Sequence, residues 1–212
     1  MKILAIDTST KNLNIAVYLE GKVRGIYLEN CLKNHSEILL SNVNNLLKDL
    51  DLKLSDFDYY CCCVGPGSFT GIRIGVCTVK TFAQIFNKKV LIVNSNELYA
   101  YNENDKNGCI ISVLNAMNNK LYYAVYKDGL EILEPSICDV ADFDKIALKF
   151  PGSIISDIDL PEFNIFYARD LNNKFANLSH KKAACNLAID FSKVEPLYVR
   201  LSSAEEKLGC AK

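Results

Sequence analysis

The feature that most constrains the fold of this chain is an internal repeat. When residues 3–21 are shifted by 108 positions, they align without a gap with residues 111–129, and six of these nineteen positions are identical. A chain of ordinary composition gives about one identity over such a length. Both stretches contain the triplet Ala-Val-Tyr, and both end at a glycine, Gly21 or Gly129. The repeat predicts an α/β protein with two related lobes.

Each lobe is expected to open with a β-meander and to carry helices packed on the resulting sheet. In the first lobe, apolar residues 3–6 end at a polar cluster, residues 13–19 alternate, and a Glu-Gly-Lys turn leads to a strand over 23–28. Further along, the patterns predict a helix after Asn34, with Glu37 at capping-box spacing, and then a buried strand over residues 59–64. A second helix is predicted over residues 70–86, capped by Ser68 or Thr70. A strand over residues 90–93 and a helix that is capped by Ser95 and ends near Tyr101 follow.

The polar stretch 102–108 is predicted to connect the lobes, which gives a first lobe over residues 1–103 and a second, smaller lobe over residues 104–212. Beyond Gly129 the apolar pattern weakens. Strands are expected there near residues 152–155 and around residues 194–201.

A glycine-rich stretch, VGPGSFTGIRIG over residues 64–75, links a predicted strand to the helix over 70–86. It lacks the lysine and hydroxyl of a phosphate-binding Walker loop, and its glycine spacing differs from the dinucleotide-binding pattern. Gly71 and Gly75 lie four residues apart on one helix face, where they permit close approach of another backbone. The stretch therefore predicts a packing surface at a helix start.

The polar turn Asp7-Thr8-Ser9 is the stronger candidate for contact with a phosphate or nucleotide. Hydroxyls and backbone amides at such a turn hold phosphate oxygens, and a carboxylate at a strand end positions hydrated magnesium. The alternative is an Asx-turn that only shapes the hairpin. In the repeat alignment Asp7 meets Asn115, which carries no charge.

No metal site is predicted. The chain has two histidines, and position 39, four residues after His35, is a leucine, so neither an HxxxH nor an HExxH pair is present there. The nine cysteines include no CxxC pair, and with no secretory signal they are expected to be reduced thiols of a cytoplasmic protein.

The bulk charge and hydropathy exclude two classes of partner. The net charge of −1 gives no basic field that would hold a nucleic acid unaided. No apolar run approaches the roughly 20 residues of a membrane-spanning helix.

Four stretches together resemble the bacterial TsaB (YeaZ) family. They are MKILAIDTS at the start, HSEILL at 35–40, VGPGSFTGIRIG at 64–75 and PLYVR at 196–200, and the glycine-rich stretch is the most specific of them. The resemblance implies a duplicated actin/Hsp70-like (ASKHA) two-lobe fold, in agreement with the repeat. It also implies that the chain keeps one histidine, His35, of a metal-binding pair found in its catalytic paralogue TsaD.

The resemblance further implies a non-catalytic scaffold or activating subunit. Such a chain pairs with TsaD, works with TsaE, and serves N6-threonylcarbamoyladenosine modification of tRNA at the adenosine beside the anticodon. It is expected to form a homodimer in isolation, to reach tRNA only through the complex, and to hold no cofactor tightly, since ATP or ADP and magnesium are used by the complex.

In this family the helices flanking the glycine-rich stretch form the dimer surface. Carried onto this sequence, the surface comprises His35, Ile38, Leu39, Leu40, Val43, Gly71, Ile72, Arg73, Gly75, Val76, Val79 and Phe82. Arg73 is expected at the rim, paired with a carboxylate of the partner. A bulky charged residue at Gly75 or Val79 is expected to abolish association and leave the fold intact.

One departure from the family concerns the second lobe. Many members carry an Asp-Ala-Arg-Arg-like run where this chain has Asn115-Ala116-Met117-Asn118. Three other functions remain open from the sequence: an ATP-dependent kinase of the ASKHA fold, a metallopeptidase and an independent homodimeric binding module.

Overall fold

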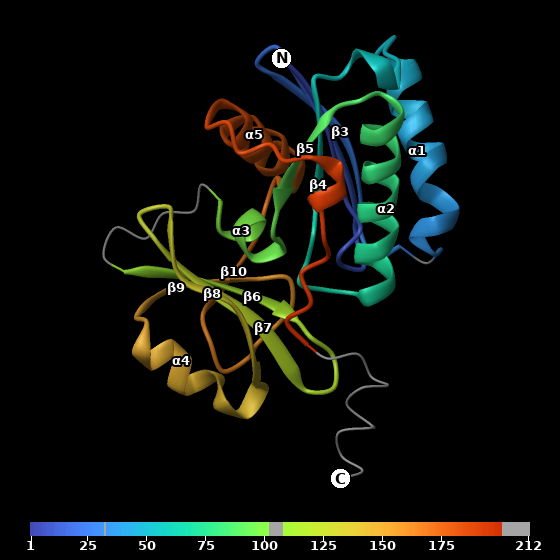
Figure 1. Cartoon of the computed structure of the whole chain (residues 1–212). Helices are drawn as coiled ribbons and strands as arrows, with labels where there is room; N and C mark the ends of the chain where they lie inside the picture. Colours follow the sequence, from blue (N-terminus) through green and yellow to red (C-terminus); the bar gives the residue numbers. More distant parts are fainter. Residues whose placement is uncertain (32, 102–107, 201–212) are drawn as a thin grey trace.

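The computed structural model describes residues 1–31, 33–101 and 108–200 and shows two lobes, each built on one mixed sheet (Figure 1). The first lobe contains, in chain order, β1 (Lys2–Asp7), β2 (Leu13–Leu19), β3 (Lys22–Leu28), α1 (His35–Asp49), β4 (Tyr59–Cys63), α2 (Phe69–Ile85), β5 (Lys89–Val93) and α3 (Ser95–Ala100). The second part of the chain contains β6 (Cys109–Asn115), β7 (Lys120–Lys127), β8 (Leu130–Asp139), α4 (Phe143–Lys149), β9 (Gly152–Ser156), β10 (Ile165–Tyr167) and α5 (Leu171–Ala184).

The two sheets have the same topology. The first has the order β3-β2-β1-β4-β5, and the second, read from β8, has the order β8-β7-β6-β9-β10. In both, the first three strands form an antiparallel meander, and the fourth and fifth strands run parallel to the first. The predicted duplication and the two opening meanders are confirmed.

The register of the two opening hairpins differs by one residue. Asp7 pairs with Asn14 across the first hairpin, whereas Leu114 pairs with Tyr122 across the second. When β2 is matched to β7 at an offset of 108, β1 therefore matches β6 at an offset of 107. Because side chains alternate between the faces of a sheet, the residue on the same face as Asp7 is Leu114. At the turn, Asn115 keeps the predicted place of Asp7, since it ends β6 and accepts a hydrogen bond from the Met117 N–H at 2.8 Å, as Asp7 does from the Ser9 N–H.

The outer face of the first sheet is covered by α1 and α2. Both helices are amphipathic, and α1 turns the stripe Leu39, Val43, Leu46 and Leu47 inward. The second lobe has α4 in the place of α1. Between β9 and β10 it has only residues 157–164, which form no helix, so no equivalent of α2 covers its sheet.

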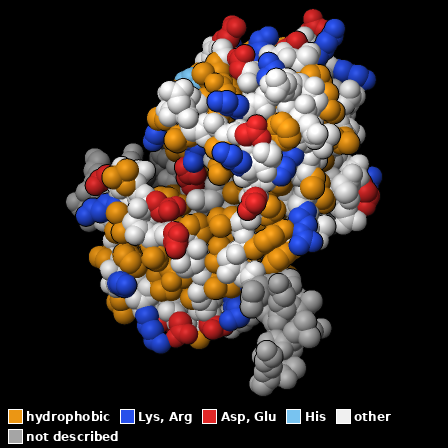
Figure 2. Space-filling view, in the orientation of Figure 1, with side chains coloured by type: hydrophobic (Ala, Val, Ile, Leu, Met, Phe, Trp, Pro, Cys, Tyr) orange, Lys and Arg blue, Asp and Glu red, His pale blue; other side chains and the backbone are white. Residues whose placement is uncertain are grey.

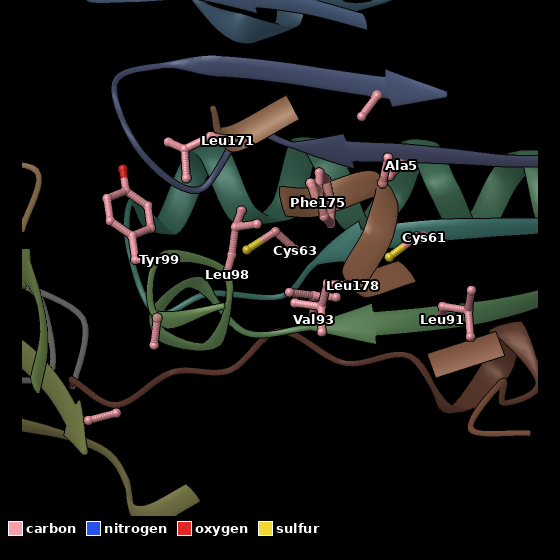
Figure 3. Close-up of a cluster of buried hydrophobic side chains, with 14 of the residues drawn as sticks. Ala5, Cys61, Cys63, Leu91, Val93, Leu98, Tyr99, Leu171, Phe175 and Leu178 are labelled. Atoms are coloured by element: carbon pink, nitrogen blue, oxygen red, sulfur yellow. The ribbon is translucent and has the colours of Figure 1, made fainter. Parts of the chain in front are cut away.

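The inner layer exchanges helices between the lobes. The helix α3 packs on β6 and β7 of the second sheet, and α5 packs on β1, β2 and β3 of the first sheet. One hydrophobic core therefore runs through both lobes, and Figure 3 shows Phe175 and Leu178 of α5 beside Cys61, Cys63 and Val93 of the first sheet. The predicted unit 104–212 is thus not one packing unit, because its last helix belongs to the core of the first sheet.

Several local predictions need correction. Asn94, not Ser95, caps α3, since the Asn94 side chain accepts a hydrogen bond from the Glu97 N–H at 2.6 Å. The strand predicted around residues 194–201 is not formed in residues 194–200, which are the part of it that the structure describes. The Leu197 N–H donates to the Val64 carbonyl, which lies just after β4. Most of the predicted connector, residues 102–107, lies outside the described residues, as does the boundary between residues 103 and 104.

The shared core yields a prediction about stability. Phe175 is fully buried against the first sheet, so Phe175→Ala should lower the free energy of unfolding by about 3–5 kcal/mol in urea denaturation. Phe166→Ala is the matched control, because Phe166 is 52% exposed and its loss should change that free energy by less than about 1 kcal/mol. Equal losses in the two variants would contradict a core held together by α5.

Candidate functional site

The glycine-rich stretch lies directly on the turn that follows β1. A Cβ atom added to Gly67 would lie 2.1 Å from the Ser9 carbonyl oxygen, and one added to Gly71 would lie 2.1 Å from the Thr8 carbonyl oxygen. The Ser68 N–H also donates to the Ser9 carbonyl at 2.7 Å. The glycines are therefore needed for close approach, but the backbone they approach belongs to the same chain and not to a partner.

The turn itself is closed by its own hydrogen bonds. The Thr8 hydroxyl donates to the Gly71 carbonyl at 2.7 Å, and the Ser9 hydroxyl lies 2.9 Å from the Ser95 hydroxyl. The Ser9 N–H donates to the Asp7 carboxylate at 2.8 Å, which is the geometry of an Asx-turn. Thr8 and Ser9 are buried, and the Asx-turn is present. Contact of Asp7, Thr8 and Ser9 with a phosphate or nucleotide stays a prediction.

Asp7 is buried at the end of β1. Burial raises the pKa of its carboxyl above the usual value of 3.8, while hydrogen bonds from Ser9 and Cys63 act in the opposite direction. His35, at the first position of α1, is a second titratable group beside it. Burial lowers the pKa of the His35 imidazole, and the Asp7 carboxyl opposes that change.

A cleft of about 870 Å³ separates the two lobes next to this turn. Its wall includes Ser9 and His35 from the first lobe, Phe69 at the start of α2, and Asn115 and Asp157 from the second lobe. The cleft therefore lies at the carboxyl ends of β1 and of β6 and β9, where open α/β sheets commonly bind ligands.

The sequence did not identify Asp157, Lys11 and Arg200 as residues of this cleft. Burial raises the pKa of the Asp157 carboxyl, against a hydrogen bond from the Asn115 N–H and the nearby charge of Lys11. Asp157 could have been found from the sequence, because it directly follows the predicted strand near residues 152–155, which is parallel to β6 in the structure. The position of Arg200 in the cleft could not be found from local sequence patterns, because only the folded chain brings its guanidinium to the Ala116 carbonyl, at 2.7 Å.

The described residues of the cleft include no assembled metal centre. No group of three or more His, Cys, Asp or Glu side chains is placed to hold a metal ion in residues 1–31, 33–101 and 108–200. The Nε2 atom of His35 is buried with no hydrogen-bond partner in that part of the chain. Leu114 and Asn115 end β6 where Asp7 ends β1, and neither of them is an acid.

The predicted dimer surface divides into two sets. Eight of its residues face the chain's own core: Leu39, Val43, Gly71, Ile72, Gly75, Val76, Val79 and Phe82. Leu40 and Arg73 are exposed, and His35 and Ile38 are half-buried. The expectation that a charged residue at Gly75 or Val79 leaves the fold intact is therefore wrong, because each would enter the core.

A shallow apolar groove of about 510 Å³ lies where α1, α2 and the α1–β4 connection meet. Leu40, Val43 and Leu47 line it from α1, and Phe82 and Phe86 line it from α2 and its end. Leu40 is 58% exposed at its edge. The groove is an apolar depression between these two helices, and the predicted dimer surface on them stays a prediction.

Comparison with known proteins agrees with this architecture. Residues 12–208 match the family model described as TsaD, tRNA N6-adenosine threonylcarbamoyltransferase. The tRNA threonylcarbamoyladenosine biosynthesis protein TsaB of Bacillus subtilis is 36% identical over 139 residues, which cover 66% of this chain and 61% of that protein. The protein of the same name from Escherichia coli is 30% identical over 129 residues, covering 60% of this chain and 55% of that protein. The chain thus aligns with less than two thirds of either relative.

A solved structure is similar over nearly the whole chain. YeaZ from Pseudomonas aeruginosa superposes with a TM-score of 0.71 over 93% of this chain and 99% of that chain, at 22% identity. Together with the two equivalent sheets, this likeness confirms the duplicated two-lobe α/β fold. Among the described residues, none of the helices is both long enough and apolar enough to span a bilayer.

The contact of α2 with the turn can be tested at Gly75, where an added Cβ atom would lie 2.6 Å from the Thr8 hydroxyl oxygen. In an otherwise unchanged chain, Gly75→Ala should lose up to about 2 kcal/mol of unfolding free energy, because overpacking outweighs the helical preference for alanine. In a Thr8→Ala background the same change should be neutral or stabilising by up to about 1 kcal/mol. Chemical denaturation of the four proteins measures both effects, and equal effects in the two backgrounds would contradict the contact.

The burial of Asp7 predicts a pH dependence of stability. Because its pKa is raised in the folded protein, the carboxyl contributes stability at low pH that is lost as the pH rises above about 4. Asp7→Asn keeps the acceptor for the Ser9 N–H and cannot ionise. Its unfolding free energy, relative to the unmodified chain, should therefore increase between pH 4 and pH 8.

Urea denaturation at several pH values measures this difference. The comparison of Asp7→Asn with the unmodified residue is repeated in a His35→Asn background. This change removes the neighbouring imidazole, whose pKa is lowered while that of Asp7 is raised. A difference between Asp7→Asn and the unmodified chain that stays constant with pH, or falls as pH rises, would show that Asp7 is not destabilised by burial of its charge.

Proposed function

The chain belongs to the TsaB (YeaZ) family, and from this membership we propose that it is a non-catalytic subunit of a tRNA-modifying complex. It pairs with a TsaD-type threonylcarbamoyltransferase, works with TsaE, and activates that enzyme in N6-threonylcarbamoyladenosine synthesis. The observation that carries the proposal is the apolar groove between α1 and α2, with Leu40 exposed at its edge.

The site next to the glycine-rich stretch supports a non-catalytic role. The stretch lies on the Asp7–Ser9 turn, whose hydroxyls and Ser9 amide are hydrogen-bonded within the chain. In the second lobe the turn residue is Asn115, which is uncharged, and the residue on the sheet face of Asp7 is Leu114, which is apolar. We therefore propose that ATP and magnesium are used by the complex and that this chain holds no cofactor tightly.

The surface charge supports an indirect contact with tRNA. On the face shown in Figure 2, lysine and arginine side chains alternate with aspartate and glutamate and form no continuous basic region. With a net charge of −1, the chain has little electrostatic attraction for a polyanion. We infer that tRNA is bound by the complex rather than by this subunit alone.

The state of the thiols fits a reducing compartment. The eight cysteines in the described residues are all free, and Cys61, Cys62 and Cys63 are buried in β4. Burial raises the pKa of the Cys61 thiol to about 12, which keeps it protonated and unreactive. We infer a cytoplasmic protein, where tRNA modification takes place.

A homodimer is the second candidate, and the same groove favours it. In a symmetric dimer the same patch of both copies meets, so an apolar groove of this kind suits contact with a second copy of the chain. In the absence of the transferase the subunit is therefore proposed to self-associate through α1 and α2.

The groove can be tested with a charged substitution at its edge. Leu40→Glu should weaken association with the TsaD-type transferase of the same organism at least about tenfold, because a carboxylate would be desolvated at the apolar interface. Light scattering on a sizing column gives the stoichiometry, and calorimetric titration gives the affinity. Both should be measured on the mixture and on the subunit alone.

Leu148→Glu provides the matched control. Leu148 is an exposed leucine of α4 in the second lobe, 80% accessible, and lies outside the groove. Its substitution should leave association unchanged, and both variants should unfold like the unmodified chain. If Leu40→Glu binds as well as Leu148→Glu, the groove is not the docking surface.

A further inference from the structure

The helix α1 carries an exposed charge near each of its ends. Glu37 lies in the first turn and Lys48 in the last turn. The Asn34 amide donates to the Glu37 carboxylate at 2.9 Å, which leaves that carboxylate at the surface with room for a further donor. In the part of the chain that the structure describes, the Lys48 ammonium has no ion-pair partner. Charges of these signs suit the helix dipole, and they also make the helix surface electrically asymmetric.

The two charges lie on one face of α1, beside the apolar groove. Glu37 and Lys48 are eleven residues apart, which is about three turns, so they differ by only about 20° around the helix axis. Leu40 and Asn44 stand between them at spacings of three and four residues. Leu40, Asn44 and Lys48 all line the groove, so this stripe forms its α1 side. The neighbouring acid, Asp49, is turned by about 100° from Lys48 and does not line the groove.

The charges of the groove itself have one sign. Lys48 and Lys53 line it, both are exposed, and no acid is among its described lining residues. A molecule that docks there is therefore favoured if it brings a carboxylate to the end of the groove where these lysines lie.

A second copy of α1 supplies that carboxylate when the two helices run antiparallel. In a symmetric dimer each residue that contacts a second residue of the other copy is matched by the reverse contact. With the two-fold axis midway along the stripe, Glu37 of each copy faces Lys48 of the other, so two equivalent ion pairs form. Parallel helices would instead bring Glu37 to Glu37 and Lys48 to Lys48.

The same arrangement brings the exposed leucine to the groove. With Glu37 level with Lys48 of the other copy, Leu40 lies one turn further along, between the levels of Asn44 and Leu47 of that copy. Both of these residues line the groove. Leu40 is 58% exposed in the single chain, so its transfer into the groove removes apolar surface from water.

We propose that the groove binds a second copy of this chain with the two α1 helices antiparallel, so that Leu40 enters the groove of the other copy and Glu37 pairs with its Lys48. This inference rests on the proposed function, whose second candidate is a homodimer through α1 and α2. It adds the orientation of the helices and the ion pairs that select it.

The test uses two charge reversals, Glu37→Lys and Lys48→Glu, in light scattering over a dilution series. Each variant alone should self-associate at least about tenfold more weakly than the unmodified chain, because both ion pairs become like-charge contacts. An equimolar mixture of the two variants should associate like the unmodified chain. In the mixed dimer each of the two contacts again joins a lysine to a glutamate.

The mixture also serves as the control for the fold, since variants with a damaged α1 would not associate when combined. Lys127→Glu is the matched control for net charge. Lys127 is an exposed residue of β7 outside the groove, and its reversal should leave self-association unchanged. Added salt should weaken the unmodified dimer and strengthen the association of either charge-reversed variant alone.

The outcomes separate this inference from the proposed function. Unchanged self-association of both charge-reversed variants overturns the inference, and the groove remains the docking surface if Leu40→Glu still abolishes the dimer. A mixture that stays monomeric overturns the antiparallel pairing. Unchanged self-association with weaker binding of the TsaD-type transferase by both variants assigns the stripe to that enzyme and overturns the inference alone. An unmodified chain that stays monomeric overturns the inference and the homodimer, but not pairing with the transferase.

Discussion

The approach of the α2 backbone to the turn after β1 is the contact on which the rest of the first lobe depends. Gly67 and Gly71 let two segments of main chain meet at a distance that no side chain permits. The Thr8 hydroxyl then closes the contact by donating to the Gly71 carbonyl. Because α2 begins at this point, the same contact sets the direction of the helix and the positions of Phe69 and Arg73 at its start.

This contact also changes what the fold can do. In a two-lobe α/β fold the turns at the carboxyl ends of the strands are the natural places for a ligand. Here one turn is covered by the glycine-rich stretch, and its hydroxyls are used within the chain. The glycine-rich stretch therefore packs on the chain's own turn.

The exchange of α3 and α5 between the lobes gives the molecule a single core. Phe175 from the second half of the chain packs among Cys61, Cys63 and Val93 of the first sheet (Figure 3). Lobes that share a core cannot move apart without exposing apolar surface, and this cost opposes their separation.

The sequence by itself determined the duplication, the first strands and the two long helices. These follow from local patterns: alternation over residues 13–19, the apolar stripe of α1 and the serine cap at Ser68, which accepts from the Gly71 N–H. The resemblance to the family also came from residues that are contiguous in sequence. Such features survive without knowledge of the fold because each is set within a few residues.

Only the tertiary structure decided the partners of these elements. Between the matched pairs Asp7–Asn14 and Leu114–Tyr122 the second turn is one residue longer, so Leu114 lies on the sheet face of Asp7 while Asn115 keeps the place of Asp7 at the turn. Gly75 faces Thr8 rather than another protein, and Tyr198 meets Arg73 from 125 positions further along the chain. Contacts of this kind join residues far apart in sequence, and no local pattern encodes them, because their energy arises only when the chain has folded.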